Sequence, residues 1–372
     1  MPVYHALGKT LVSHEELNAR AYDVERFATQ LASSPRDAAI EFSTGATTGV
    51  EVTSAASAME SFTPFESIGL HKPLAIEIRH IYTGRFPKGS FGGSKKDMLA
   101  ATAVKSAATF GSAPRAVNYI KRSVESHANI RNPAASEDGT ALVFYSPALT
   151  ESAMLATFEL VFDEFPQKVF EALGNAFSGA GKIPIFAAKN VFFLAAGVVT
   201  KMIGRVGESI FDGQLAFQAT EELSFNRPGA SIPQADYRLL TQSPLPQQTL
   251  EGCSLDPRGV LMDAAGAPYA GEEPYVTISL DGRSMPEYEG FMPHAASAAV
   301  LERFFNVKEG ADQPLEPLLD AARIYSDLRF RREANEVRRR LELLATESPE
   351  RPRLEERLHA LSLNISNEEL RI

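Results

Sequence analysis

A glycine-rich and strongly apolar block, Phe165–Phe211, places the tightest constraint on how this chain can fold. Its longest run without a charged side chain extends from Asn190 to Thr200, between Lys189 and Lys201. A single helix needs roughly 20 mainly apolar residues to span a bilayer, so this run is too short. We therefore expect a buried core helix. The alternatives are a helix that lies in a membrane interface and a thin anchor whose two flanking lysines reach the headgroups.

The block divides at the glycines of residues 179–181 into two expected helices. The first, Gln167–Phe177, carries an apolar face that includes Leu173. The second is expected over Val191–Val206, where Gly197 and Gly204 would let another backbone approach closely. We predict an apolar helical insertion at 166–211 whose interaction or membrane-contacting residues are Phe186, Val191, Phe192, Phe193, Leu194, Val198 and Val199.

Outside this block much of the sequence alternates in the manner of β-strands. In Leu74–Tyr82 the apolar residues recur at every second position, with Glu77 and Arg79 on the opposite face. Further strands are expected over Asp97–Ser106, Ala116–Val124, Leu142–Tyr145, Met154–Phe162, Leu215–Phe225 and Tyr275–Leu280. Runs of strands joined by turns favour a sandwich or barrel over a parallel α/β sheet. The predicted fold class is α+β, an antiparallel β-sandwich core with an apolar helical insertion and a helical C-terminal tail.

We predict three parts along the chain. Residues 1–35 are expected to form an N-terminal helical segment, in which Ser13 and Glu16 have the spacing of a capping box. Residues 36–310 are expected to form the β-sandwich domain, with the insertion at 166–211, a loop-rich stretch at 226–274 that wraps or links, and a helix over Pro293–Phe305. Residues 311–372 form an Arg-rich helical tail.

The segment Thr157–Phe165, TFELVFDEF, ends a predicted strand in the acidic pair Asp163 and Glu164. Together with the strand order, it resembles a C2-type β-sandwich over about residues 70–165. The resemblance implies end loops that can bind calcium, phospholipid headgroups or protein partners. Calcium-binding members draw several aspartates from two loops, whereas here only Asp97, Asp163 and Glu164 lie near predicted strand ends. Calcium takes six to eight oxygen ligands, so we interpret these acids as surface residues and predict no metal and no cofactor.

Arginines crowd the C-terminal tail among glutamates. This pattern is typical of a solvated helical face with ion pairs between neighbouring turns. A more specific interpretation is a surface for an acidic partner helix or for anionic lipid. The predicted partner-binding residues of the tail are Arg329, Arg332, Arg338 and Arg339.

Composition limits the partners and the compartment. The 372 residues carry a net charge of −10, which makes nucleic acid an improbable partner because nucleic-acid binders present clustered Lys and Arg. A single cysteine, Cys253, cannot form an intramolecular disulfide and fits a reducing compartment. The first residues contain no apolar run of a secretory signal, so we expect a cytoplasmic protein.

Motifs of enzyme chemistry are incomplete, and we predict no catalytic residue. The loop Gly84–Ser90 has glycine spacing but lacks the lysine of a phosphate loop. His14 and Glu15 begin a zinc-protease pattern, yet Asn18 stands in place of the second histidine. A nucleophile elbow at Ser94 fails because Lys96 replaces the required glycine. His71, His80, His127 and His294 could in principle join Ser94 or Asp97 in an unrecognised hydrolase site.

These observations favour a non-enzymatic binding or effector protein that acts through a protein partner, a second copy of itself or a membrane surface. In one variant of this hypothesis the apolar hairpin is masked and is released by a partner or by cleavage between Pro244 and Pro274. The alternatives are a hydrolase with an unrecognised site and a structural subunit of a larger assembly.

Overall fold

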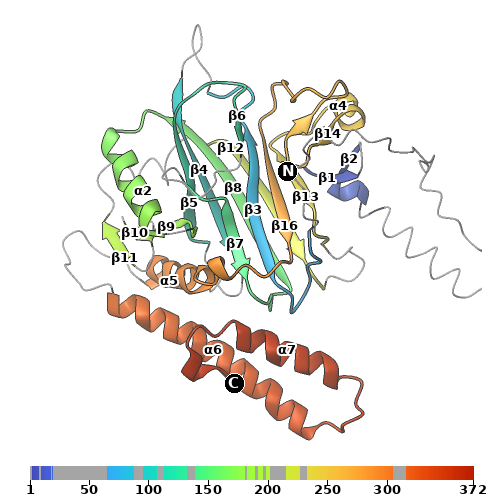
Figure 1. Ribbon diagram of the computed structural model, residues 1–372, viewed down its shortest axis with the longest axis vertical. Coiled ribbons are helices and arrows are strands. Elements are labelled where there is room, and N and C mark those ends of the chain that lie inside the picture. Colours follow the sequence, from blue (N-terminus) through green and yellow to red (C-terminus); the bar gives the residue numbers. More distant parts are fainter. Residues whose placement is uncertain are drawn as a thin grey trace, which may run out of the picture.

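The computed structural model describes residues 2–7, 10–17, 19, 65–87, 95–106, 113–131, 139–180, 182–188, 192–195, 198–201, 215–226, 233–304 and 316–372. In these ranges the chain is an α+β protein. Its antiparallel strands form two open seven-stranded sheets and one separate two-stranded sheet, with helices on the outer faces and at one end (Figure 1).

The first sheet, sheet A, consists of β1 Val3–Leu7, β2 Thr10–Ser13, β3 Leu74–Tyr82, β6 Asn129–Arg131, β7 Leu142–Ser146, β13 Tyr237–Thr241 and β16 Tyr275–Asp281. The strands lie in the order β2-β1-β13-β16-β3, and both β6 and β7 pair with β3. All of these pairs are antiparallel, so the N-terminal strands and β13 belong to the same sheet as the central strand β3.

The second sheet, sheet B, consists of β4 Lys96–Lys105, β5 Arg115–Val124, β8 Ala153–Asp163, β9 Ile185–Ala188, β10 Phe192–Ala195, β11 Val198–Lys201 and β12 Leu215–Ser224. Its strands lie in the order β11-β10-β9-β5-β4-β8-β12. The seven strands predicted from alternation are confirmed as β3, β4, β5, β7, β8, β12 and β16, with ends that differ by at most one or two residues.

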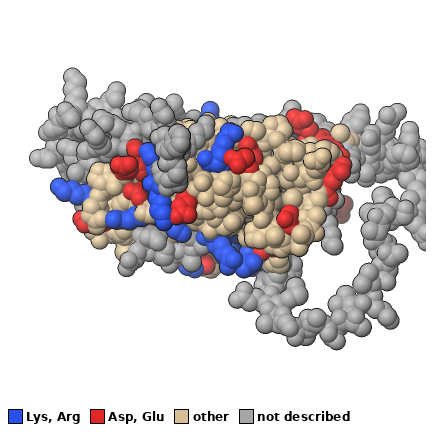
Figure 2. Space-filling view, turned by 90° about the horizontal axis from the view of Figure 1, so that it is seen from above, with Lys and Arg blue, Asp and Glu red and all other residues tan. Residues whose placement is uncertain are grey.

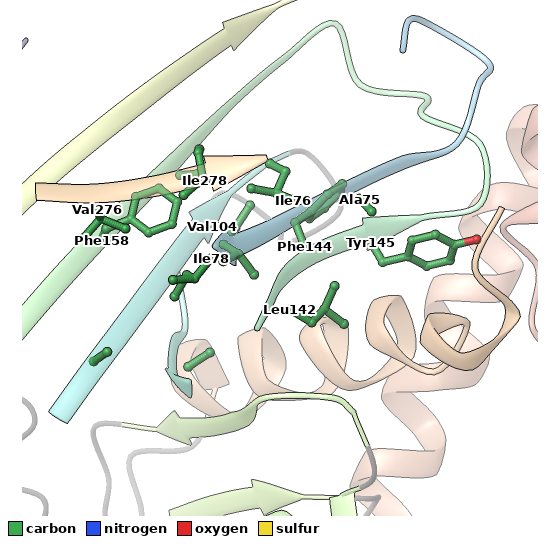
Figure 3. Packing of buried hydrophobic residues seen from close by; sticks show 14 of the residues in the cluster. Ala75, Ile76, Ile78, Val104, Leu142, Phe144, Tyr145, Phe158, Val276 and Ile278 are labelled. Atoms are coloured by element: carbon green, nitrogen blue, oxygen red, sulfur yellow. The ribbon is translucent and has the colours of Figure 1, made fainter. Parts of the chain in front are cut away.

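One large buried cluster takes side chains from both sheets. Phe158 of β8 and Val104 of β4 belong to it, as do Ile76, Val276 and Ile278 of sheet A (Figure 3). The helix α5, Phe291–Phe304, closes one end of this cluster with Phe291, which meets Phe144 edge to face at 5.5 Å between ring centroids. This helix confirms the one predicted over Pro293–Phe305.

Other elements cover the remaining faces of the sheets. The helix α2, Gln167–Ala180, packs Leu173 and Phe177 against Leu99 and Val117 of sheet B, which confirms the first helix predicted in the apolar block. On sheet A a separate cluster around Tyr82 and Tyr275 is covered by α4, Gln247–Gly252, and by the short pair β14 Ser254–Leu255 and β15 Leu261–Met262.

The prediction of a second helix in the apolar block is wrong. Within Val191–Val206 the chain forms β10 and β11, an antiparallel pair that extends sheet B through β9. Short apolar runs rich in Phe and Val can form either a buried helix or a buried strand, and periodicity does not separate the two. The insertion at 166–211 is therefore one helix followed by three short strands in the described residues.

Two further interpretations of the sequence need correction. The N-terminal segment begins with β1 and β2 rather than with helix, and helix appears only from His14. The predicted cap is present there, because the backbone N–H of Glu16 donates to Ser13 Oγ at 3.1 Å. The stretch 226–274 is not simply a wrapping loop, since β13 lies inside sheet A. The division of the chain into three domains stays a prediction.

The C-terminal tail is a helical hairpin of α6, Glu316–Leu343, and α7, Arg351–Leu363 (Figure 1). It has a hydrophobic cluster of its own around Phe330, Val337 and Leu361. The buried Asn364 joins the hairpin to the sheets, because its amide donates to Ala148 O at 2.6 Å. Among the described residues no helix combines the length and the apolar character that a membrane span requires.

Candidate docking surface and basic groove

The outward face of α6 is the first candidate site. The helix buries Ala322, Phe330, Ala334, Val337 and Leu341. On its opposite side Ile324, Tyr325 and Leu328 are 48%, 59% and 47% exposed. At 3.6 residues per turn, Arg332 and Arg339 follow on the same side of the helix toward its C-terminus, and Arg338 lies at the edge of that side nearest Ile324. We call the six residues Ile324, Tyr325, Leu328, Arg332, Arg338 and Arg339 the α6 stripe.

Cations dominate the C-terminal half of the α6 stripe. Arg332 lies 3.8 Å from Glu336, and these side chains are 81% and 66% exposed, so the pair is weak. Within the described residues Arg338 and Arg339 form no ion pair and no hydrogen bond. Arg329, the fourth predicted arginine, lies beyond the Tyr325 edge of the stripe, and its guanidinium is 4.8 Å from the centre of the Phe330 ring. Three of the four predicted tail residues thus share the stripe.

A groove between the hairpin and the ends of the sheets is the second candidate site. It has a volume of about 440 Å³. We call it the basic groove, and its lining comprises Leu70, His71, Thr150, Ser152, Asn226, Arg340, Glu350, Arg353, Leu354 and Arg357. The first five come from loops at the ends of strands, and the others come from α6, α7 and the turn between them. These positions are far apart in sequence and meet only because the hairpin docks on the sheets.

The groove carries three guanidinium groups and one carboxylate. Arg340 Nη2 donates to Glu350 Oε2 at 3.0 Å, and Arg357 Nη2 lies 3.9 Å from Glu333 Oε2. No described residue pairs with Arg353. The half-buried His71 takes a left-handed backbone, φ 68°, and its N–H donates to Leu149 O at 2.8 Å. Burial lowers the pKa of His71, and the neighbouring Arg357 and Arg353 lower it further, while Glu356 opposes the shift.

In comparisons with known proteins, no family model, curated protein or solved structure matches the chain.

Figure 2 shows the described residues on the face that lies away from the hairpin. On the face shown in Figure 2, Lys and Arg lie next to Asp and Glu, and wide uncharged areas separate these groups. Such a mixed surface does not offer the continuous cationic track that binds nucleic-acid phosphates. That nucleic acid is an improbable partner stays a prediction from the net charge of −10.

The predicted apolar interaction residues lie in sheet B. Phe186 and Leu194 are only 3% and 2% exposed and belong to the main buried cluster. They therefore do not form a surface in this structure. Phe192, Phe193, Val198 and Val199 lie on β10 and β11, and their side chains lie outside the described set, as does Val191 altogether. Their predicted role stays a prediction.

Two of the acids near the predicted strand ends, Asp97 and Asp163, accept hydrogen bonds from backbone N–H groups. Asp97 accepts from the N–H of Ser123 at 3.0 Å and from that of Phe165 at 3.2 Å. Asp163 is the cross-strand partner of Asp97 and accepts from the N–H of Glu164 at 2.8 Å. Within the part of the chain that the structure describes, no group of three or more His, Cys, Asp or Glu could hold a metal ion.

The four candidate histidines do not gather at one site. His71 lines the basic groove, and His294 of α5 contacts the carbonyl oxygen of Gly290, which precedes that helix. His127 Nδ1 lies 2.8 Å from Tyr82 Oη. His80 is fully buried beside Tyr275, and burial lowers its pKa to about 4. Asp97 is occupied by the backbone bonds above, and Ser94 lies outside the described residues.

A buried charged cluster, which the sequence analysis missed, joins the two sheets. Arg238 of β13 is 2% exposed and lies with its Nε 3.5 Å from Glu221 Oε1 on β12. Its other guanidinium nitrogens contact Asp236 and donate to Gln234 O at 3.1 Å. His5, the cross-strand partner of Arg238, is 3.0 Å from His14 between Nε2 and Nδ1. No motif marks these residues, because they come from four separate segments.

This cluster predicts a pH-dependent stability. Burial, together with Arg238 and His14, lowers the pKa of His5 from 6.5 to about 3. Below about pH 6.5 the unfolded chain therefore binds a proton at His5, whereas the folded protein keeps this ring neutral down to about pH 3. The contribution of His5 to stability is present above pH 6.5 and is lost as the pH falls toward 3. Burial raises the pKa of Glu221 to about 7, although Arg238 opposes this shift. Between the ordinary pKa of a glutamate and pH 7 the folded protein binds the proton of Glu221 more tightly than the unfolded chain does, so the Glu221 contribution to stability increases as the pH falls.

We expect His5→Gln to remove the His5 contribution. Between about pH 6 and pH 3 the free energy of unfolding of the wild type should fall more steeply than that of the variant, by roughly 1 kcal/mol per pH unit. Urea unfolding at several pH values measures this difference. His359→Gln, an exposed change on α7, is the control and should follow the wild-type curve. Parallel curves for the wild type and His5→Gln would contradict the prediction.

Proposed function

We propose that this protein is a non-enzymatic binding protein and that the α6 stripe docks an acidic amphipathic helix of a protein partner. One observation carries the proposal: an exposed apolar patch, Ile324, Tyr325 and Leu328, is continued along the same helix face by cations. Contiguous exposed apolar groups with a polar rim are typical of protein interaction surfaces.

The chemistry of the stripe favours a helix of opposite charge. An amphipathic helix presents apolar anchors at i, i+3, i+4 and i+7, which suits a narrow surface on another helix. Carboxylates on its flank would meet Arg332, Arg338 and Arg339, and such complementarity raises the association rate and selects the partner. A symmetric dimer with parallel α6 helices is less suitable, because its two-fold axis would bring the arginines of the two copies together.

Designed peptides provide the test. One carries leucines at helical spacing on one face and glutamates beside them, and the other has lysines in place of the glutamates. We expect fluorescence anisotropy to show saturable binding of the glutamate peptide only. Leu328→Asp, and separately the double variant Arg338→Glu and Arg339→Glu, should weaken binding at least about tenfold, since each buried anchor or charge pair contributes on the order of 1.4 kcal/mol or more.

Leu155→Asp is the matched control, because Leu155 is an apolar residue on β8 with a similar exposure of 38%. It should leave the affinity unchanged. Equal binding of the two peptides, or binding that ignores both stripe variants, would refute the proposal. If sedimentation equilibrium gives twice the mass of the chain, and Leu328→Asp abolishes this doubling, the stripe binds a second copy of the chain and the proposed partner helix is refuted.

We also propose that sheets A and B form a β-sandwich that carries the hairpin as its binding element. The shared buried cluster, to which strands of both sheets contribute, supports this arrangement. A sandwich core would give α6 a rigid base through α5 and Asn364, and rigid bases reduce the entropy lost on binding.

A cytoplasmic location is part of the proposal. The free Cys253 is buried, and burial together with Asp263 raises the pKa of its thiol, so it is a poor nucleophile. This thiol suits a structural role in a reducing compartment.

A further inference from the structure

We infer that the basic groove binds a small soluble phosphomonoester, with the phosphoryl group held by Arg340, Arg353 and Arg357. This site lies beside the α6 stripe but uses different side chains, so it goes beyond the proposed docking of a partner helix. Each proposal can fail without the other.

The cations of the groove come from two helices and point to a polyoxyanion. Arg353 and Arg357 are four residues apart on α7 and therefore share one face of that helix. Arg340 comes from the last turn of α6. All three line one cavity in a protein whose net charge is −10, so the groove departs in sign from the chain as a whole. Guanidinium groups bind phosphate oxygens through paired N–H donors, and several of them surround a phosphoryl group better than a planar carboxylate.

Neutral donors line the opposite wall of the groove. Thr150 and Ser152 carry hydroxyl groups, and Asn226 carries an amide. None of these three side chains forms a hydrogen bond within the described residues. Hydroxyl and amide groups donate to phosphate oxygens without adding charge, so they can complete the coordination that the arginines begin.

The single carboxylate of the groove already forms an ion pair with one of the arginines. Glu350 accepts from Arg340 at 3.0 Å, and the two side chains are 55% and 62% exposed, so the pair can open at little cost. A bound phosphoryl group would take over this guanidinium, and Glu350 would turn toward solvent. Glu350 therefore competes with the ligand for Arg340.

The size of the groove favours a ligand larger than phosphate itself. Its volume of about 440 Å³ lies in the range of small-molecule sites. Leu70 and Leu354 supply apolar surface beside the cations, and the half-buried His71 supplies a ring nitrogen. A carbon skeleton of a few atoms attached to the phosphoryl group would fill this part of the groove.

Isothermal titration calorimetry on the full chain tests the inference with glucose 6-phosphate, inorganic phosphate and glucose. We expect glucose 6-phosphate to bind with a saturable 1:1 isotherm, inorganic phosphate to bind more weakly, and glucose not to bind. Arg353→Ala and Arg357→Ala should each weaken the binding of glucose 6-phosphate at least tenfold, and Glu350→Gln should strengthen its binding several-fold. Arg353→Lys, which keeps the charge but loses the paired donors, should also weaken it.

The double variant Arg338→Ala and Arg339→Ala is the control, since it removes two cations from the same hairpin outside the groove. It should change the affinity less than twofold. An equal loss in this control, or the absence of saturable binding of glucose 6-phosphate, overturns the inference. Phosphatidylglycerol vesicles form the last arm: binding to vesicles that depends on Arg353, without binding of the soluble ester, also overturns it.

Discussion

Arg238→Ala should lower the free energy of unfolding by about 3–5 kcal/mol, because it leaves the buried Glu221 carboxyl group without its cation. The guanidinium of Arg238 meets Glu221 on sheet B and Asp236 beside sheet A, and both Arg238 and Glu221 have side chains that are 2% exposed. Urea unfolding near neutral pH followed by circular dichroism measures the change.

Arg258→Ala is the control for this prediction, because Arg258 pairs with Asp256 while 57% exposed. Its cost should be below about 1 kcal/mol, as for other exposed ion pairs. The double variant Arg238→Met and Glu221→Leu removes both charges and should recover much of the loss. A loss for Arg238→Ala no larger than that for Arg258→Ala would show that the cluster does not stabilise the fold.

Phe158→Ala should cost about 3–5 kcal/mol, since it removes a large side chain from a close-packed core and leaves a cavity. Phe158 lies on β8 of sheet B, is 1% exposed and shares its cluster with Val276 and Ile278 of sheet A (Figure 3). Leu155→Ala, on the same strand but at a position 38% exposed, should cost much less.

The comparison between these two variants tests the proposed sandwich. If sheets A and B pack against each other through this face, the denaturant midpoint should fall far more for Phe158→Ala than for Leu155→Ala. Similar midpoints for the two variants would mean that this face of β8 does not carry the core.

Most of the strands could be predicted from their short apolar runs with period-two spacing, although only β8 and β12 alternate in burial over much of their length, while β3 and β16 are buried almost throughout. Leu74–Tyr82 is confirmed as β3 with the predicted ends. The apolar block misled the analysis because β9, β10 and β11 are short and have few charged residues to mark an outer face. In such segments the partner strands decide the conformation, and a local pattern cannot identify them.

The N-terminus shows how a correct local signal can be extended too far. The cap formed by Ser13 is present, but the residues before it pair with β13, a contact between positions more than 200 apart. The basic groove and the Arg238 cluster were missed for the same reason. Each collects residues from distant segments, so only the tertiary fold brings their charges together. That Arg332 and Arg339 lie together could be predicted, because seven residues are close to two full turns of one helix.

Photo-crosslinking is the most direct test of the docking proposal. A photoreactive residue in place of Leu328 should crosslink to the glutamate peptide, and the adduct should map by mass spectrometry to the apolar face of that peptide. The same photoreactive residue in place of Leu155 should give no adduct. Crosslinking at position 155 but not at position 328, or at neither position, would contradict docking on the α6 stripe.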